Sequence, residues 1–382
     1  MKRILFVSNG HGEEAIAARL ASELAALCAV QCDHLALVGE FGHPSQMRDV
    51  GPRRKLPSGG LIAMGNLPNI AADLHAGLLA HTLQQRRFLR GARGTYAVVV
   101  AVGDVFGLLM ALQLRSPTVY VGTAKSVYVA PYGRLEERVL RHARAIFVRD
   151  EPTAERLRGH GVAAQAPGNA IVDLYATDIA VPKCFEQQFA LFPGSRAAAY
   201  ADALFLCSVV RRIADVRPDV GALLSIAPGL EPVRFADLLR ADGWSVVRSE
   251  EPQVPFVLSS GDRAVVRAWS GPVGALLAGT DLVLGQAGTA NEAAAAAGVP
   301  VVAFELAGEK KSVWYRKRQR GLLGDALKIV RGDAQEASLA VLALLEDAAL
   351  RSAMGAIGRE RMGPPGGVHA IAQAIAAIAE AA

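Results

Sequence analysis

The chain has 382 residues, of which 52% are hydrophobic and 20% are charged, and its formal net charge is +5. This length suits two domains, and no run of about 20 apolar residues is free of charge, so no membrane-spanning helix is predicted. The cysteines lack the spacing of a metal site and are interpreted as reduced thiols of a cytoplasmic protein: Cys28, Cys32, Cys184 and Cys207.

The first predicted element is a strand over residues 3–8, which form a short apolar run. Asn9-Gly10-His11-Gly12 follows as a turn. A helix then begins with Glu13 and Glu14 in its first turn, where the helix dipole favours acids. The apolar run is too short for a signal peptide, because glycines stand where its apolar region would continue. The expected start is therefore strand, glycine-rich turn and helix.

The same unit recurs along the chain. Apolar runs at 96–102, 118–121 and 145–148 are typical of strands buried on both faces, and residues 105–114 are expected to be helical. The pattern breaks near 178–183, and a second set of units follows. Alternating strands and helices predict an α/β fold with two Rossmann-like domains and parallel sheets. The expected domains are 1–178 and 186–363, and by fold analogy a C-terminal helix, about 364–382, packs back on the first.

One motif lies where the first strand of the second domain should end, at Phe192-Pro193-Gly194-Ser195-Arg196. Glycine allows the backbone to approach a phosphate, and free N–H groups near a helix start favour an anion. Ser195 adds a hydroxyl, and Arg196 can bind two phosphate oxygens at once. The alternative is an ordinary turn, but the combination favours a phosphate site.

A second motif, residues 285–292, also follows a strand. Backbone N–H groups and Thr289 are placed to bind a pyrophosphate, and Glu292 is placed to accept hydrogen bonds from ribose hydroxyls. The alternative is that Glu292 only caps its helix. Because Pro193 to Arg196 precede it by some ninety residues in a matching position, the pair of motifs predicts nucleotide-diphosphate binding.

These motifs resemble lipid-A-disaccharide synthase and the branch related to it. Residues 193–196 look like its PGSR element, and Gly288-Thr289-Ala290 with Glu292 looks like its Ser-Gly-Thr-Ala segment with a downstream Glu. Residues 147–173 resemble the stretch before the interdomain link, and residues 8–13 resemble the start of the related branch. The resemblance implies the GT-B fold, with sheets facing a central cleft, an acceptor-binding N-terminal domain and a nucleotide-sugar-binding C-terminal domain.

By this resemblance, the chain is an inverting glycosyltransferase that moves a GlcNAc-like sugar from a UDP-sugar to a lipid or lipid-linked acceptor. Arginine, backbone amides and a helix dipole neutralise the departing diphosphate in such enzymes, so no metal and no cofactor is expected. The expected substrate-binding residues are Gly10, Gly12, Gly194, Ser195, Arg196, Gln286, Ala287, Gly288, Thr289, Asn291, Glu292 and Gln319.

Such a transfer needs a base that takes the proton of the acceptor hydroxyl. Asp104 ends a strand at the edge of the sheet where ligands bind in these folds, and His11 and Glu13 lie in the first turn on the same edge. The synthase places its catalytic Asp in an Asp-Phe-Asn segment, whereas here Asp104 is displaced by one place and the Asn is absent. The predicted catalytic set is Asp104, His11 and Glu13, with the choice among them open.

Basic and apolar segments suggest where the acceptor is met. Residues 61–79, followed by Arg86, Arg87 and Arg90, suit shallow contact with a membrane surface, and an ordinary core helix is the alternative. We expect a cytoplasmic protein with peripheral contact to the inner face of the cytoplasmic membrane. A basic run at 310–320 is placed to reach phosphates. The basic residues are not interleaved with an aromatic platform, so nucleic acid is not an expected partner. The oligomeric state is not predicted.

Two other functions remain open. A UDP-sugar 2-epimerase uses the same two-domain fold and needs several acids and a histidine, for which Asp104, Glu13 and His11 are candidates. A binding protein that kept the nucleotide site and lost the chemistry would explain the departures around Asp104.

Overall fold

The computed structural model describes residues 1–38, 47–54, 75, 77–179, 181, 183–261, 263–305 and 310–382, with the backbone alone for residues 11 and 310–312. They divide into two compact units. Unit 1 comprises Met1–Leu174 and Gly363–Ala382, and unit 2 comprises Tyr175–Met362. No helix among these residues is long and apolar enough to cross a lipid bilayer. The segment suggested for membrane contact lies outside the described residues up to 74, and its last two residues begin a helix.

Unit 1 is built on one seven-stranded sheet in which every neighbouring pair is parallel, in the order β3-β2-β1-β4-β5-β6-β7. Its strands are β1 (Lys2–Ser8), β2 (Val30–Ala36), β3 (Arg48–Asp49), β4 (Val98–Gly103), β5 (Thr118–Gly122), β6 (Ala145–Val148) and β7 (Ala164–Gln165). Its helices are α1 (His11–Leu27), α3 (Leu78–Gly91), α4 (Val105–Ala111), η1 (Leu112–Leu114), α5 (Arg134–Leu140), α6 (Glu151–Gly159), α7 (Ala170–Asp173) and α15 (Gly367–Ala381).

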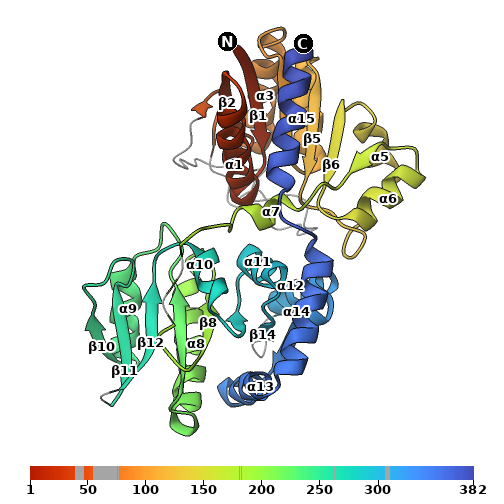
Figure 1. Cartoon of the computed structure of the whole chain (residues 1–382). Helices are drawn as coiled ribbons and strands as arrows, with labels where there is room; N and C mark the ends of the chain where they lie inside the picture. Colours follow the sequence, from red (N-terminus) through yellow and green to blue (C-terminus); the bar gives the residue numbers. More distant parts are fainter. Residues whose placement is uncertain are drawn as a thin grey trace. The chain divides into compact units, whose positions relative to one another are not determined.

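Helices cover both faces of this sheet. α1 and α15 lie side by side on one face (Figure 1). The other face packs against α3, α4, α5 and α6 through buried side chains such as Leu89, Leu108, Leu140 and Leu157. Since β4 is buried along its whole length, its continuous run of apolar residues agrees with a strand covered on both faces.

The carboxylate of Asp173 holds the start of the last helix, α15, through hydrogen bonds. Both oxygens of Asp173 accept hydrogen bonds from the start of α15, Oδ1 from Gly366 N and Oδ2 from Val368 N, each at 2.7 Å. A side chain on Gly168 would meet the backbone of Gly367 at 2.7 Å, so the two segments approach as closely as glycine permits. The Pro-Gly-Asn segment at 167–169 and Asp173 therefore hold the returning chain end.

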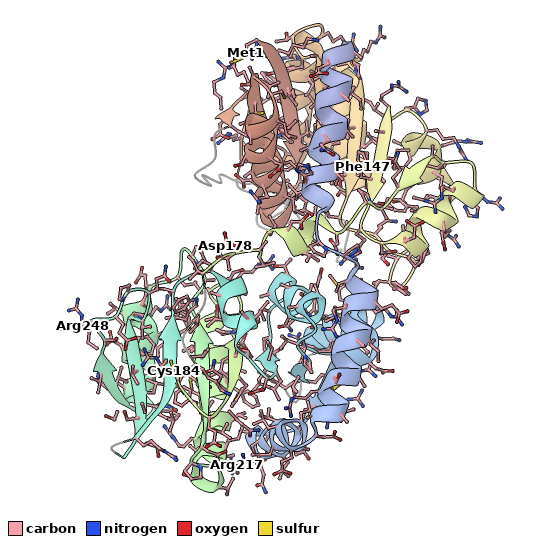
Figure 2. The ribbon with its side chains drawn as sticks, viewed as in Figure 1. Met1, Phe147, Asp178, Cys184, Arg217 and Arg248 are labelled. Carbon is pink, nitrogen blue, oxygen red and sulfur yellow. The ribbon has the colours of Figure 1, made fainter. Side chains whose placement is uncertain are left out.

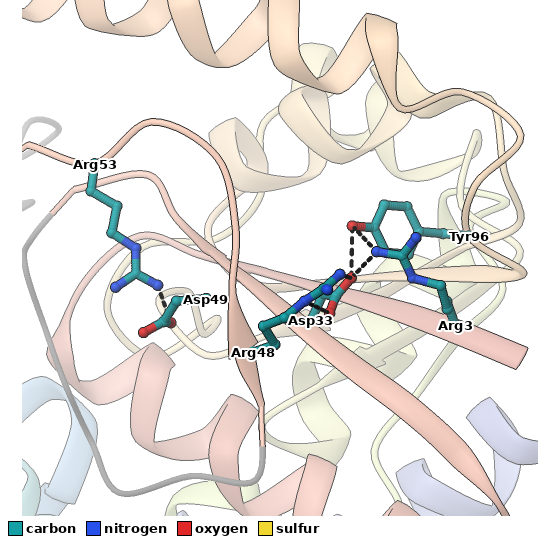
Figure 3. A network of polar contacts seen from close by, with 6 residues as sticks. All are labelled: Arg3, Asp33, Arg48, Asp49, Arg53 and Tyr96. Carbon is teal, nitrogen blue, oxygen red and sulfur yellow. Dashed lines mark hydrogen bonds and ion pairs between the residues drawn. The ribbon is translucent and has the colours of Figure 1, made fainter. Parts of the chain in front are cut away.

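A polar network centred on a buried aspartate joins three strands of unit 1 and the residue Tyr96, which precedes β4 (Figure 3). Asp33 on β2 is fully buried and accepts hydrogen bonds from Arg3, Arg48 and the hydroxyl of Tyr96. Burial alone would raise the pKa of Asp33, but these hydrogen bonds outweigh it and lower the pKa. The network ties β1 to β2, to β3 and to the segment just before β4.

Unit 2 has an eight-stranded sheet in the order β10-β11-β12-β9-β8-β13-β14-β15. Its strands are β8 (Gln187–Phe192), β9 (Val220–Ser225), β10 (Ser245–Arg248), β11 (Phe256–Ser260), β12 (Arg263–Trp269), β13 (Val283–Gly285), β14 (Val301–Glu305) and β15 (Leu327–Arg331). Its helices are α8 (Ala199–Val216), α9 (Pro232–Ala241), α10 (Val273–Ala278), α11 (Thr289–Ala297), α12 (Lys310–Leu323), η2 (Gly324–Ala326), α13 (Ala334–Glu346) and α14 (Ala348–Met362). Asp178, labelled in Figure 2, lies in the segment that leads from α7 to β8.

One edge of this sheet differs from the expected parallel arrangement. β10 pairs with β11, and β11 with β12, in antiparallel fashion. The connection between β11 and β12 is only two residues long, which suits a hairpin and cannot hold the crossover that parallel neighbours need. The remaining strands are parallel, and the main core lies between the sheet and α8, α9 and α13.

Candidate functional site

In each sheet there is one point at which the strand order reverses, because the chain adds strands first on one side of a central strand and then on the other. In unit 1 the chain passes from β1 to β2 on one side and returns to β4 on the other, and in unit 2 β8 has β9 on one side and β13 on the other. Ligands of open α/β sheets bind beyond the carboxyl ends of the strands at such a point. The segments singled out in the sequence lie at these two points: Asn9–Glu13 with Asp104 in unit 1, and 194–196 with 286–292 in unit 2.

In unit 2, two helices begin beside each other at this point without a side-chain cap. α8 begins shortly after the turn of Gly194, Ser195 and Arg196, and α11 begins after Gly288. The N–H groups of Gln286 and Ala287 donate to Phe192 O (2.8 and 3.2 Å), which joins the two turns. Uncapped helix starts present N–H donors and a partial positive charge, so this edge suits an anion with two charged groups.

The first turn is open to solvent. Gly194 has φ +108°, and a Cβ at this position would meet nothing within 4 Å, which leaves room for a ligand against the backbone. Ser195 and Arg196 are exposed. Thr289, also exposed, accepts a hydrogen bond from the hydroxyl of Tyr175 at 2.9 Å, a partner that the sequence did not suggest.

A buried arginine stabilises the second turn through hydrogen bonds. Arg316 is 4% exposed, donates to Gln286 O (3.0 Å) and to Gln319 Oε1 (2.6 Å), and also meets the side chain of Gln286. Gln319 in turn donates to Ala287 O at 3.0 Å. Burial lowers the pKa of the Arg316 guanidinium. The sequence placed Arg316 in a basic run that reaches phosphates, but in the structure it supports the turn.

Asn291 also shapes this turn. Its side chain is fully buried and donates to Gly285 O at 3.2 Å. A Cβ on Gly285 would overlap Asn291 Oδ1, so glycine is required at the end of β13. Glu292 is half-buried in the first turn of α11. Three of the predicted binding residues are thus exposed to solvent, namely Ser195, Arg196 and Thr289. The side chains of three others form hydrogen bonds that stabilise the turn itself, namely Gln286, Asn291 and Gln319.

In unit 1 the corresponding point carries carboxylates. Asp104 caps α4 by accepting a hydrogen bond from Gly107 N at 2.9 Å, and its other oxygen accepts one from Asn9 Nδ2 at 3.0 Å. Glu13 lies between the ends of β1 and β4, because a Cβ on Gly10 would be 2.7 Å from Glu13 Oε2 and a Cβ on Gly103 would be 2.7 Å from Glu13 Cγ. Asp104 and Glu13, which are distant in the sequence, thus form one acidic cluster, with Asn9 bound to Asp104 from 95 positions away.

The pKa of the Glu13 carboxyl is raised to about 7: burial raises it most, a hydrogen bond from its own backbone N–H lowers it, and the charge of Asp104 raises it. A carboxyl that titrates near neutral pH suits proton transfer. A Cβ on Gly12 would meet nothing within 4 Å, so the backbone there is open. The side chain of His11, the third catalytic candidate, lies outside the described residues.

Further buried polar residues lie on the strands next to the Asn9–Glu13 turn. Ser8, which precedes Asn9, lies 2.8 Å from His34 Nε2 through its Oγ, and His34 Nδ1 lies 3.4 Å from Asp49 Oδ1. Asp49 pairs with Arg53 (Figure 3). Ser8 and His34 are each 1% exposed, so they brace the carboxyl ends of β1, β2 and β3 and are not open to a substrate.

Comparison with known proteins supports the fold. No protein-family model matches the chain, and neither does any curated protein sequence. Among solved structures, CalG4, the calicheamicin glycosyltransferase, has a TM-score of 0.62 at 17% identity and covers 99% of this chain and 98% of its own. A candidate UDP-N-acetylglucosamine 2-epimerase of Listeria monocytogenes has a TM-score of 0.61 at 15% identity, with 100% and 98% coverage.

A third similar structure is the UDP-GlcNAc 2-epimerase of Neisseria meningitidis bound to UDP-GlcNAc, with a TM-score of 0.56 at 14% identity and coverage of 98% of this chain and 100% of that one. The expected fold class is confirmed: the chain has the α/β GT-B fold that glycosyltransferases and UDP-sugar epimerases share.

Proposed function

We propose that the chain is an enzyme that acts on a UDP-sugar, and specifically an inverting glycosyltransferase that needs no metal. It moves a GlcNAc-like sugar to the hydroxyl of a lipid or lipid-linked acceptor. The observation that carries this proposal is the contrast between the two points of reversal. Unit 2 presents two uncapped helix starts and Arg196, which suit a diphosphate, whereas unit 1 presents Glu13 and Asp104, which suit a hydroxyl and its proton.

In this proposal unit 2 binds the donor. The N–H groups at the starts of α8 and α11, with Arg196 and Thr289, hold the two phosphates and stabilise the negative charge that develops on UDP as it leaves. Glu292 accepts hydrogen bonds from the ribose. Similar structures carry such ligands: UDP-GlcNAc in the Neisseria meningitidis epimerase and UDP in S. aureus MnaA.

The surface of unit 1 supports an acceptor with an apolar part. Leu79 and Leu83 on α3 are 66% and 63% exposed, and Phe106 and Leu109 on the adjacent α4 are 37% and 44% exposed. From residue 77 to residue 115 the chain carries five arginines and one acid, Asp104. Apolar and basic side chains together suit the surface of an anionic membrane. We therefore propose peripheral contact of this α3–α4 surface with the inner face of the cytoplasmic membrane.

The test is release of UDP from UDP-GlcNAc with and without lipid extract. Release that needs the lipid, with a new glycolipid detected by mass spectrometry, supports transfer. Arg196→Ala is expected to weaken UDP binding by about 10- to 100-fold, the equivalent of one charge-assisted hydrogen bond of about 1.5–3 kcal/mol. Unchanged UDP affinity in this variant, together with no change in any lipid, contradicts the proposal.

An epimerase is the second candidate, and the similarity to two UDP-GlcNAc 2-epimerases favours it. In that case the acids of unit 1 act on the sugar itself. Incubation with UDP-GlcNAc alone, followed by NMR of the sugar, separates the two functions, because an epimerase changes the configuration at C2 without any acceptor. Tight UDP-GlcNAc binding without turnover in either assay identifies a binding protein.

A further inference from the structure

The acidic cluster of unit 1 contains two carboxylates in different surroundings. Asp104 is engaged at both oxygens, Oδ1 by Gly107 N and Oδ2 by Asn9 Nδ2. These donors suit an ionised carboxylate and fix its orientation at the start of α4. To take a proton from a substrate, Asp104 would have to share an oxygen that already accepts a hydrogen bond.

Glu13 is placed differently. Its carboxyl lies against the backbone of Gly10 and Gly103, both of which have positive φ, and side chains at these positions would occupy its place. Among the described residues the hydrogen-bond donor near its carboxylate is its own backbone N–H. The group is therefore free to bind a hydroxyl, and burial and Asp104 raise its pKa into the range where a base works near neutral pH.

Asn9 links Asp104 to the end of β1. Its side chain is 6% exposed, and its Oδ1 has no hydrogen-bond partner within the part of the chain that the structure describes. A buried acceptor without a partner costs about 1–3 kcal/mol. If the position served packing alone, an apolar side chain would avoid this cost. The amide at this position therefore points to a role beside Asp104.

Within the part of the chain that the structure describes, other charged groups of α1 have partners elsewhere. Glu14, the next residue, interacts with Arg53, which follows β3 by four residues. On the α15 side the charged group that meets α1 is His369, which pairs with Glu23 much further along the helix. The charged group that acts on Glu13 is Asp104, which directly follows β4, and Asp104 is bound by the uncharged Asn9, which directly follows β1.

We propose that Glu13 is the catalytic base, that Asp104 is its charge partner, and that Asn9 is a positioning residue that holds Asp104. The inference rests on the proposed function. The proton of the acceptor hydroxyl passes to a Glu13 oxygen, and the acceptor oxygen forms a bond to C1 of the sugar. The bond from C1 to the phosphate oxygen breaks, its electron pair leaves with UDP, and the proton on Glu13 is then released to water.

The first test does not need turnover. Full-length protein labelled with ¹³Cδ-glutamate is titrated by NMR, and the Glu13 signal is identified by its loss in Glu13→Gln. The expected midpoint is about 7 in the wild type. It is expected to be lower in Asp104→Asn, because the neighbouring negative charge is gone. A wild-type midpoint near the usual 4.5, or no shift in Asp104→Asn, overturns the inference whatever the substrate proves to be.

The second test uses the pH dependence of kcat for UDP release. Glu13→Gln is expected to lower kcat at least 100-fold, and Asp104→Asn is expected to move the acid limb of the profile to lower pH. Asn9→Ala is expected to lower kcat while the KM for UDP-sugar stays the same. The matched control is Glu155→Gln, an exposed carboxyl on α6, which should leave the profile unchanged.

Full activity in Glu13→Gln with none in Asp104→Asn would make Asp104 the base and overturn the inference, while the proposed transfer stands. The opposite failure is also recognisable. If no UDP-sugar is turned over by the wild type, the proposed function fails, and the NMR titration still decides how the two carboxyls divide their roles.

Discussion

Replacement of Glu13 by glutamine should stabilise unit 1 at high pH and not at low pH. The carboxyl pKa rises from 4.5 to about 7 on folding. Below the lower value Glu13 is protonated in both states and has no effect. Between the two values the folded state binds more protons than the unfolded state, so the free energy of unfolding falls as pH rises. Glutamine has nearly the same shape and does not ionise.

The size of the effect follows from the shift. At 1.36 kcal/mol for each pH unit, a rise of about 2.5 units amounts to about 3 kcal/mol at pH 8, and to nothing at pH 4. Because Glu13 is partly accessible to solvent, screening lowers this difference in the free energy of unfolding to about 2 kcal/mol. We therefore expect Glu13→Gln to be more stable than the wild type by about 2–3 kcal/mol at pH 8.

Hydrogen exchange is the suitable assay, because a two-unit protein need not unfold in one step. Peptides that cover β1 and β4 report the opening of unit 1 at each pH. All three tryptophans, Trp244, Trp269 and Trp314, belong to unit 2, so their fluorescence during urea unfolding is an internal control that the substitution should not change. Equal stabilisation at pH 4 and pH 8, or none at pH 8, would show that the surroundings of Glu13 do not disfavour its charge.

Three further predictions test how the two units support their sites. Gly103→Ala should lower turnover more than tenfold with UDP affinity retained, since its Cβ would displace Glu13; equal loss of UDP binding by calorimetry would contradict this. Arg316→Leu should destabilise unit 2 by about 2–4 kcal/mol, measured by tryptophan fluorescence in urea, because Gln286 O loses its donor and Gln319, which donates to Ala287 O, loses the arginine that holds it. A change below about 0.5 kcal/mol would contradict the supporting role of Arg316. Asp173→Ala should destabilise the docked α15 by about 2–3 kcal/mol through the loss of two hydrogen bonds to a carboxylate, and unchanged hydrogen exchange in α15 would contradict it.

Local sequence was sufficient for most of the elements. The apolar runs at 3–8, 96–102, 118–121 and 145–148 correspond to β1, β4, β5 and β6, because strands buried on both faces need apolar side chains at every position. The helix expected at 105–114 is α4 followed by η1. Breaks in the pattern marked the turns that follow β1, β8 and β13. The antiparallel edge of unit 2 was not foreseen, since a short strand has the same pattern whichever way its neighbour runs.

For the candidate sites, the sequence was sufficient in unit 2 but not in unit 1. The sequence alone identified Gly194 to Arg196 and residues 285–292 as turns suited to a phosphate, because residue type and position after a strand carry that information. It left the choice among Asp104, His11 and Glu13 open, and it placed Arg316 among phosphate-binding residues.

Only the tertiary structure brought Asn9 and Glu13 to Asp104 and put Arg316 beneath a turn thirty residues away. Strand order decides which carboxyl ends are neighbours, and burial decides which charged group changes its pKa. Both depend on contacts between residues that are distant in the chain. For this reason the sequence determined which turns have residues suited to a phosphate, and the fold decided how the surroundings of the acids of unit 1 differ.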